Sequence, residues 1–255
     1  MIRYLLACLL LVAIAAPAGS ETVVAGLSQN RISITANFDG SEILIFGAVK
    51  RFEPIPEGAE PLQIVITVAG PSVPVTVRRK ERVAGIWVNT QSVDVDRAPV
   101  FYVVATSDPF YDVMSNVEDL RHKVSITRAI RSVGAPADIE NSTDFTAALI
   151  RVRSREGVYK LQEGTVNISE ETLFNTSVAL PANLHEGDYT TRIFLTRDGV
   201  VLDQLERVIY VQKVGLERWL FNLSTEQPFY YGILSLIIAA AAGWGASAVF
   251  RYLKS

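Results

Sequence analysis

Cysteine and histidine are scarce in this chain of 255 residues. The single cysteine, Cys8, lies near the N-terminus, and the only histidines are His122 and His185. Residues 1–20 predict a secretory leader, with an apolar core followed by a small-residue cleavage site at Ala16-Pro17-Ala18. Cleavage at this site would remove Cys8 and so exclude disulfides, thiol chemistry and thiolate metal sites from the mature protein. An exported protein of this kind must rely on its hydrophobic core, and the lack of disulfides favours a bacterial periplasm.

The signature motifs of common enzyme classes are missing too. The chain has no G-x-S-x-G nucleophile elbow, no P-loop and no dinucleotide-binding glycine pattern. His185-Glu186 lacks the second histidine of a zinc-protease motif, so an exposed loop histidine is the preferred interpretation. His122 lies in a charged run on a predicted helix, and the scattered carboxylates offer no nucleophile–base pair for a hydrolase. We therefore expect a protein that is not an enzyme and holds no cofactor or metal.

Positive charge is in slight deficit. The sequence contains 24 lysines and arginines against 27 aspartates and glutamates. Three of the cations lie in the leader and the C-terminal tail, so the region between the leader and the last apolar run holds 21 cations and 27 acids, a net charge of −6. A mildly acidic exported domain has no electrostatic reason to bind nucleic acid or an anionic membrane surface as its main partner.

One long uncharged run is present, over residues 229–250. A helix of this length matches the hydrocarbon core of a bilayer, about 30 Å thick, so the run predicts a transmembrane helix with lipid as its partner. Residues 251–255 contain Arg251 and Lys254 and no acid, which predicts a cytoplasmic C-terminus. The sequence therefore predicts a single-pass protein of the bacterial inner membrane with a periplasmic N-terminal ectodomain.

Two further features accompany the predicted span. An amphipathic helix is predicted over residues 214–228, either on the outer membrane surface or packed as the last helix of the ectodomain. Its apolar residues recur at the spacing of one helical face: Leu216, Trp219, Leu220 and Leu223. Within the span, small residues form a stripe that would let a second helix approach closely, although such residues are common in any span. The stripe consists of Ser235, Ala239, Gly243 and Ser247.

Residues 21–107 predict an immunoglobulin-like β-sandwich domain. Short segments with alternating apolar and polar residues are separated by turn residues, as expected for antiparallel strands. Asp39-Gly40 predicts a hairpin turn between a strand over residues 32–38 and a strand over residues 42–49. Residues 100–105 are apolar at every position, which predicts a strand buried on both faces.

A helical connector is predicted over residues 108–159. Its first helix would present Val117, Leu120 and Val124 on one face toward the sheets. Asp144 is expected to cap a second helix. The apolar residues of that helix are Phe145, Ala148, Leu149 and Val152.

A second β unit is predicted over residues 160–213, and the connector helices would complete its core. Asp198-Gly199 predicts another hairpin turn. Tyr189 follows a loop and enters a strand, which predicts a tyrosine corner whose hydroxyl bonds back to that loop. The predicted fold class is therefore mainly β, with one or two immunoglobulin-like sandwich units, a helical connector and one C-terminal transmembrane helix.

Charged residues cluster at two places in the first β unit. Arg78, Lys80 and Arg82 would line one face of a strand and could hold an oxyanion, although a solvated strand face is the ordinary interpretation. Asp94 and Asp96 would also share a strand face, either as paired carboxylates of a cation site or, as we prefer, as charges at a sheet edge.

Several segments together resemble one family, the alphaproteobacterial "putative transmembrane protein" family. These segments are Gly70-Pro71, Val75–Asn89, Phe101–Pro109, Val211–Phe221 and the pairing of Gly243-Trp244 with Phe250-Arg251. The resemblance covers nearly the whole mature chain. It implies the same layout as the family, with a leader, a β-rich exported region and one C-terminal span.

The resemblance also directs attention to particular residues and to a partner. Trp87 and Asn89 lie in its most recognisable segment and are candidates for a binding surface, although Trp87 could instead be the core tryptophan of the sandwich. A sulfite-exporter-like permease is the partner that the resemblance suggests. We therefore expect an interaction or accessory subunit of an envelope or transporter system. The alternative is a membrane-tethered module that binds a small oxyanion or glycan through Arg78, Lys80 and Arg82.

Overall fold

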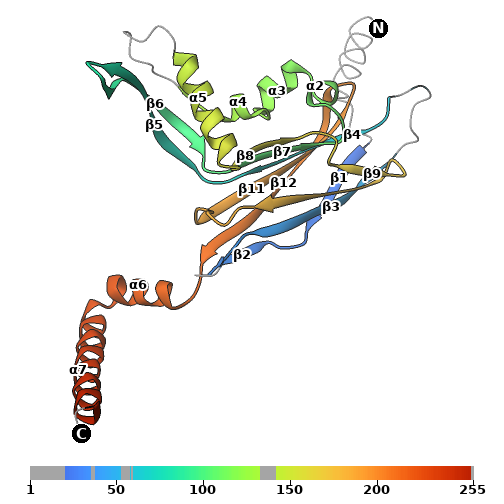
Figure 1. Cartoon of the computed structure of the whole chain (residues 1–255). Helices are drawn as coiled ribbons and strands as arrows, with labels where there is room; N and C mark the ends of the chain where they lie inside the picture. The colour runs from blue at the N-terminus through green and yellow to red at the C-terminus, as the bar shows by residue number, and fades with distance from the viewer. Residues whose placement is uncertain (1–20, 36–37, 53–57, 59, 133–141, 254–255) are drawn as a thin grey trace, which may run out of the picture. The chain divides into compact units, whose positions relative to one another are not determined.

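The computed structural model describes residues 21–35, 38–52, 58, 60–132 and 142–253 (Figure 1). The predicted leader lies outside this range. The strands are β1 (Glu21–Leu27), β2 (Arg31–Ile34), β3 (Ser41–Arg51), β4 (Gln63–Ala69), β5 (Ser72–Val83), β6 (Ile86–Pro99), β7 (Tyr102–Thr106), β8 (Tyr159–Gln162), β9 (Asn167–Ser169), β10 (Leu173–Leu180), β11 (Gly187–Arg197) and β12 (Val200–Lys213). The helices are α2 (Phe110–Val113), α3 (Asn116–His122), α4 (Ile126–Ala129), α5 (Ser142–Arg155), α6 (Leu216–Glu226) and α7 (Pro228–Leu253).

Two sheets face each other in the β-rich part of the chain (Figure 1). The four-stranded sheet has the order β1-β3-β10-β9, and the six-stranded sheet has the order β2-β12-β11-β4-β7-β8. Strands from the two predicted β units pair with each other. Strand β3 pairs with β10, β4 pairs with β11, and β7 pairs with β8. The two ranges therefore share sheets, and the predicted mainly-β fold is confirmed.

Burial follows the alternation of the strands, as expected when one face of a sheet points inward. In β10 every second residue is buried, and in β3 Ile43 and Ile45 are fully buried while Leu44 between them is 44% exposed. Strand β7 is buried at every position, because strands lie on both of its sides and helices cover the outer face of its sheet. The prediction of a strand buried on both faces is thus confirmed.

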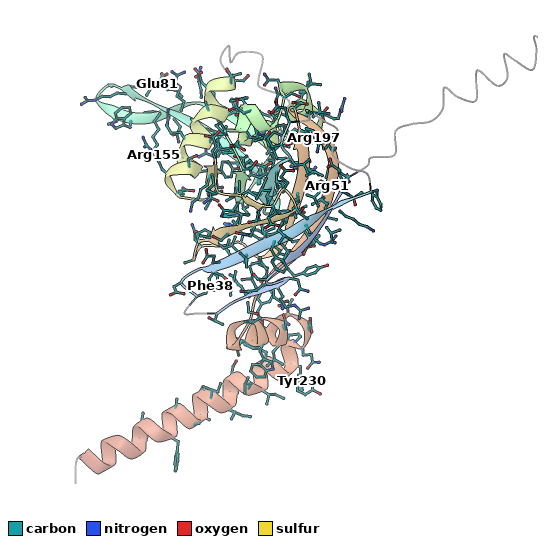
Figure 2. The ribbon with its side chains drawn as sticks, turned by 90° about the vertical axis from the view of Figure 1, so that its right-hand side faces the viewer. Phe38, Arg51, Glu81, Arg155, Arg197 and Tyr230 are labelled. Atoms are coloured by element: carbon teal, nitrogen blue, oxygen red, sulfur yellow. The ribbon has the colours of Figure 1, made fainter. Side chains whose placement is uncertain are left out.

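A buried carboxylate connects the two sheets at one end. Glu21 of β1 lies 3.1 Å from Arg51 Nε on β3 and 2.9 Å from Arg197 Nη2 on β11. Figure 2 labels both arginines. Because Glu21 is only 5% exposed, these two guanidinium groups provide the opposite charge that a buried carboxylate needs. The backbone N–H of Val23 also crosses between the sheets, donating to Asp203 Oδ2 at 2.7 Å.

Of the two predicted hairpins, one is confirmed and one is wrong. Asp198 and Gly199 both have positive φ, at 51° and 71°, and join β11 to its antiparallel partner β12. A type I′ turn requires positive φ at both central residues. At Asp39-Gly40 only Gly40 has positive φ, and the strands on either side belong to different sheets, β2 beside β12 and β3 between β1 and β10.

The tyrosine corner is confirmed. Tyr189 is 1% exposed, and its hydroxyl donates to the carbonyl oxygen of His185 at 2.9 Å. Tyr159 makes a similar bond, donating to the carbonyl oxygen of Pro99 at 2.6 Å. Burial raises the pKa of each of these two tyrosines to about 12. His185 itself is exposed in the loop, as predicted.

Helix α3 has the opposite orientation to the one predicted. Val117 and Leu120 are 65% and 62% exposed, and Val124 is buried but lies beyond the end of the helix. Glu118 and Asp119 are buried instead. The expected apolar face toward the sheets is therefore wrong, because ion pairs and backbone hydrogen bonds to the two carboxylates decide which side of α3 points inward.

The polar contacts of α3 are specific. Glu118 pairs with Arg121 at 2.6 Å and lies 3.3 Å from His122 Nε2. Ser115 caps the helix by accepting a hydrogen bond from the backbone N–H of Glu118. Arg192 of β11 donates to the carbonyl oxygen of His122 at 2.7 Å, so His122 belongs to this packed ionic cluster.

Helix α5 begins earlier than expected. It starts at Ser142, so Asp144 lies within its first turn, where a carboxylate stabilises the helix dipole, and not at the capping position. Phe145 and Leu149 are buried, while Val152 is 47% exposed. Helix α5 packs against β5, β6 and β8. Its buried residues therefore cover part of the β5–β6 hairpin.

The C-terminal part of the chain forms a separate compact unit, containing Ser33–Phe38 and Gln212–Ser255. Within it, α6 and α7 follow one another with Gln227 between them. Residues Pro228–Ser247 have a mean hydropathy of 1.5 and none of them is buried. This is the one candidate membrane span among the residues that the structure describes, and it agrees with the predicted transmembrane helix.

Candidate functional site

The predicted site residues of the first β unit lie on one hairpin, β5–β6. The strands run antiparallel from Ser72 and Pro99 to a two-residue loop, Ala84-Gly85. Both loop residues have positive φ, at 49° and 88°, as a type I′ turn requires. The sequence does not predict this turn, because an Ala-Gly pair lacks the asparagine or aspartate that usually marks a type I′ hairpin.

The hairpin passes from the core into solvent. At its base Val93 and Val95 of β6 are fully buried, whereas at its tip Val83 is 51% exposed and Ile86 is 65% exposed. Every residue from Lys80 to Thr90 is exposed. Figure 1 shows the hairpin reaching past the end of α5, and Figure 2 labels Glu81 near its tip. The tip therefore carries apolar side chains that none of the residues described by the structure covers.

The strand register brings five predicted site residues onto one face of this hairpin. Arg82 is directly opposite Trp87, and Lys80 is directly opposite Asn89. Arg78 lies on the same face as Lys80, because residues two apart on a strand point the same way. A register shift between Arg79 and Lys80 leaves an extra residue on β6, and this bulge keeps Asn89 on the face of Lys80.

Trp87 is 69% exposed, so the interpretation of Trp87 as the core tryptophan of the sandwich is wrong. The physical reason is its position, two residues beyond the Ala84-Gly85 turn and far along the strands from the buried base. An exposed tryptophan leaves a large apolar surface in water. Covering that surface with a partner would contribute about 25 cal/mol of favourable free energy per Å² buried. Trp87 is thus suited to contact something outside the chain.

The opposite face of the tip is apolar. Val83 pairs with Ile86, and Glu81 pairs with Val88, which is 38% exposed. These apolar residues were not singled out in the sequence, because a short apolar run does not distinguish a projecting tip from a buried strand. Together with Trp87, they give the tip apolar surface on both faces.

The cations of the hairpin have few partners. Arg79 lies 3.8 Å from Glu81, an exposed pair that contributes little to stability. Arg82 donates weakly to the carbonyl oxygen of Gly85 at 3.5 Å. The structure records no ion pair to Arg78 or Lys80 from any residue it describes. Most of this positive charge is therefore free to meet a partner or a ligand.

The carboxylates Asp94 and Asp96 of β6 are exposed on this two-stranded sheet. Asp94 Oδ1 accepts a hydrogen bond from Thr76 Oγ1 at 2.6 Å, and Asp96 has a partner as well. No group of three or more potential metal-binding side chains occurs among the described residues. Both strands of a two-stranded sheet are edge strands, so these carboxylates lie at a sheet edge, as in the preferred interpretation.

The small-residue stripe of the span lies on α7. Ser235 donates to the carbonyl oxygen of Tyr231 at 2.9 Å, and Ser247 has a partner too. All four stripe residues are exposed, as is most of α7. The stripe stays a predicted helix contact.

Comparisons with known proteins identify the family of the chain. A family model described as "Putative transmembrane protein (Alph_Pro_TM)" matches residues 22–252. No curated protein matches the chain. A solved structure, the sporulation control protein Spo0M from Bacillus subtilis, is 11% identical and covers 76% of this chain with a TM-score of 0.28. The chain spans 50% of the length of that structure, and a TM-score this low carries no functional argument.

Proposed function

We propose that this chain, which belongs to the alphaproteobacterial family described as "Putative transmembrane protein", is a non-enzymatic, single-pass protein of the inner membrane. Its periplasmic ectodomain binds another envelope protein, and a sulfite-exporter-like permease is the candidate that the family resemblance suggests. The β5–β6 hairpin makes the contact. The observation that carries this proposal is the exposure of Trp87 at the tip of that hairpin.

Three properties support the hairpin as the docking element. Tryptophan is enriched among the residues that dominate binding energy at protein interfaces. The apolar side chains Ile86 and Val88 add exposed apolar surface on the opposite face of the same tip. Arg78 and Lys80, which lack ion-pair partners among the residues described here, would favour an acidic surface on the partner and speed its approach.

The membrane anchor supports the same proposal. A candidate span at Pro228–Ser247 would keep the ectodomain close to other membrane proteins, which raises the effective concentration of any partner in the same membrane. A modest contact area is enough under these conditions. The projecting hairpin provides such an area without any rearrangement of the sandwich.

Photo-crosslinking in living cells tests the docking role of the hairpin. The photoreactive amino acid p-benzoylphenylalanine is placed at Trp87 in the tagged full chain, and at Val200 in a matched control. Val200 is 49% exposed and also follows a two-residue turn. We expect one discrete crosslinked membrane protein from Trp87 and none from Val200. The proposal is wrong if position 87 gives no discrete product, or gives the same products as position 200.

The variant Trp87→Ala separates docking from folding. Because Trp87 is mostly exposed, its replacement should change the free energy of unfolding by less than about 0.5 kcal/mol. The partner identified by crosslinking should nevertheless be lost when the variant is purified in mild detergent. Retention of that partner at the wild-type level would contradict the role of the tip.

A further inference from the structure

A cleft opens between strand β5 and helix α5. It encloses about 440 Å³, which lies within the roughly 300–1,000 Å³ typical of small-molecule sites. One wall is formed by residues 77–80 of β5, and the other by the first part of α5, from Asp144 to Arg151. The cleft is separate from the apolar tip of the hairpin, which lies farther along the strands.

The lining of the cleft is strongly cationic. Arg78, Arg79 and Lys80 line it from β5, and Arg151 lines it from α5, against a single carboxylate from Asp144. No residue that the structure describes makes an ion pair with Arg78, Lys80 or Arg151. Neighbouring like charges repel each other, so an anion in the cleft would relieve this repulsion and accept charge-assisted hydrogen bonds.

The floor of the cleft is apolar. Val77 lies on β5, and Phe145 and Ala148 lie on α5. Phe145 is only 4% exposed, whereas Val77 and Ala148 are partly exposed, so Val77 and Ala148 provide most of the apolar surface that a ligand could touch. Arg79 follows Val77 by two positions and points to the same side of the strand, so a guanidinium group lies next to this floor.

The cleft offers more than the strand face predicted from the sequence. The sequence suggested an oxyanion at Arg78, Lys80 and Arg82, all from one strand. The structure adds Arg151 from a helix that is distant in sequence, while Arg82 does not line the cleft. Cations on two facing walls can contact one anion from both sides, which a single exposed strand cannot do.

We propose that this cleft binds a small organic anion that carries an apolar group. The carboxylate, sulfonate or phosphate of the ligand contacts Arg79 and Arg151, and its apolar group lies on Val77 and Ala148. This binding goes beyond the proposed docking function, because it is a property of the protein alone and needs neither the partner nor the tip of the hairpin.

Fluorine NMR with 4-fluorophenylacetate tests the proposal on the full chain in a non-ionic detergent. The neutral probe 4-fluorophenylacetamide has the same ring without the charge. Sulfate has the charge without the ring, and because it contains no fluorine its binding is measured by its displacement of 4-fluorophenylacetate. We expect 4-fluorophenylacetate to bind at least about tenfold more tightly than either, because a charge-assisted bond and apolar contact act together. Equal binding of the amide, tighter binding of sulfate, or no binding of the acid would overturn the proposal.

Matched variants locate the binding. Arg79→Gln and Arg151→Gln should each weaken 4-fluorophenylacetate by about tenfold, whereas Arg82→Gln should leave it unchanged. All three arginines are exposed, so the variants should fold, and an unchanged melting temperature verifies this. If Arg82→Gln weakens binding as much as Arg79→Gln, the effect is general charge attraction and the cleft is not the site. Crosslinking from Trp87 should be unchanged in Arg151→Gln, because Arg151 lies on α5 and outside the hairpin that makes the proposed contact, so failure of one proposal does not imply failure of the other.

Discussion

Replacing Asp119 with alanine is expected to lower the free energy of unfolding by about 3–5 kcal/mol. Asp119 is 3% exposed. Its Oδ1 accepts hydrogen bonds from the backbone N–H groups of Val124 at 3.1 Å and Ser125 at 2.7 Å. Its Oδ2 lies 2.8 Å from Arg128 Nε. The variant would leave two backbone N–H donors and a partly buried guanidinium group without a partner. An unsatisfied buried polar group lowers the free energy of unfolding by its full desolvation penalty.

Urea denaturation of the full chain in mild detergent, followed by circular dichroism, measures this effect. The neighbouring variant Leu120→Ser is the control, because Leu120 is 62% exposed and its replacement should change the free energy of unfolding by less than about 0.5 kcal/mol. A sequence pattern that placed Leu120 in the core would predict the reverse order. An Asp119→Ala variant as stable as Leu120→Ser would contradict the orientation of α3.

Replacing Gly47 with alanine is expected to cost about 3 kcal/mol or more. A Cβ atom at this position of β3 would lie 2.4 Å from the carbonyl oxygen of Val24 and 2.5 Å from Cζ of Phe174. Val24 is held in the ladder between β1 and β3, and Phe174 is 2% exposed, so neither group can move away. The added methyl group would therefore separate strands at the centre of the four-stranded sheet.

The matched control for this prediction is Gly26→Ala on β1. A Cβ atom there would lie 3.2 Å from the end of the Phe46 ring, which is 46% exposed and can turn aside. We expect Gly26→Ala to change the free energy of unfolding by less than about 1 kcal/mol, because alanine also restricts the unfolded chain. Equal effects of the two variants in urea denaturation would show that Gly47 is not packed as described.

The sequence predicted the features that depend on local pattern. Asp198-Gly199 forms the predicted turn because both residues adopt positive φ, and Tyr189 forms the predicted corner because its loop is only a few residues long. The uncharged run of residues 229–250 lies within one apolar helix, α7. Each of these depends on interactions between residues that are close in sequence.

The features that depend on distant residues could not be predicted in this way. Asp39-Gly40 has the same residues as Asp198-Gly199, but β3 pairs with β1 and β10, so no hairpin forms there. The orientation of α3 depends on Arg128 and Arg192, which lie outside the helix. The pairing of the two predicted β units is also a long-range property, because alternation within a strand does not identify its neighbours.

The candidate site was predicted in part. The sequence identified Arg78, Lys80, Arg82, Trp87 and Asn89, and the hairpin register places them on one face. It did not reveal that the tip projects into solvent, because exposure depends on where the rest of the sandwich ends. It also gave no indication of Arg151, which approaches β5 only through the packing of α5.

Cysteine labelling in cells tests the central claim, that an ectodomain carrying this hairpin is exported and held by a C-terminal span. Cys8 is the only cysteine and lies in the predicted leader, so the mature wild-type chain should not react with a maleimide. The account predicts that Arg82→Cys reacts with a membrane-impermeant maleimide in intact spheroplasts, and that Ser255→Cys reacts only after the membrane is permeabilised. Reaction of Ser255→Cys in intact spheroplasts, with Arg82→Cys protected, would contradict it.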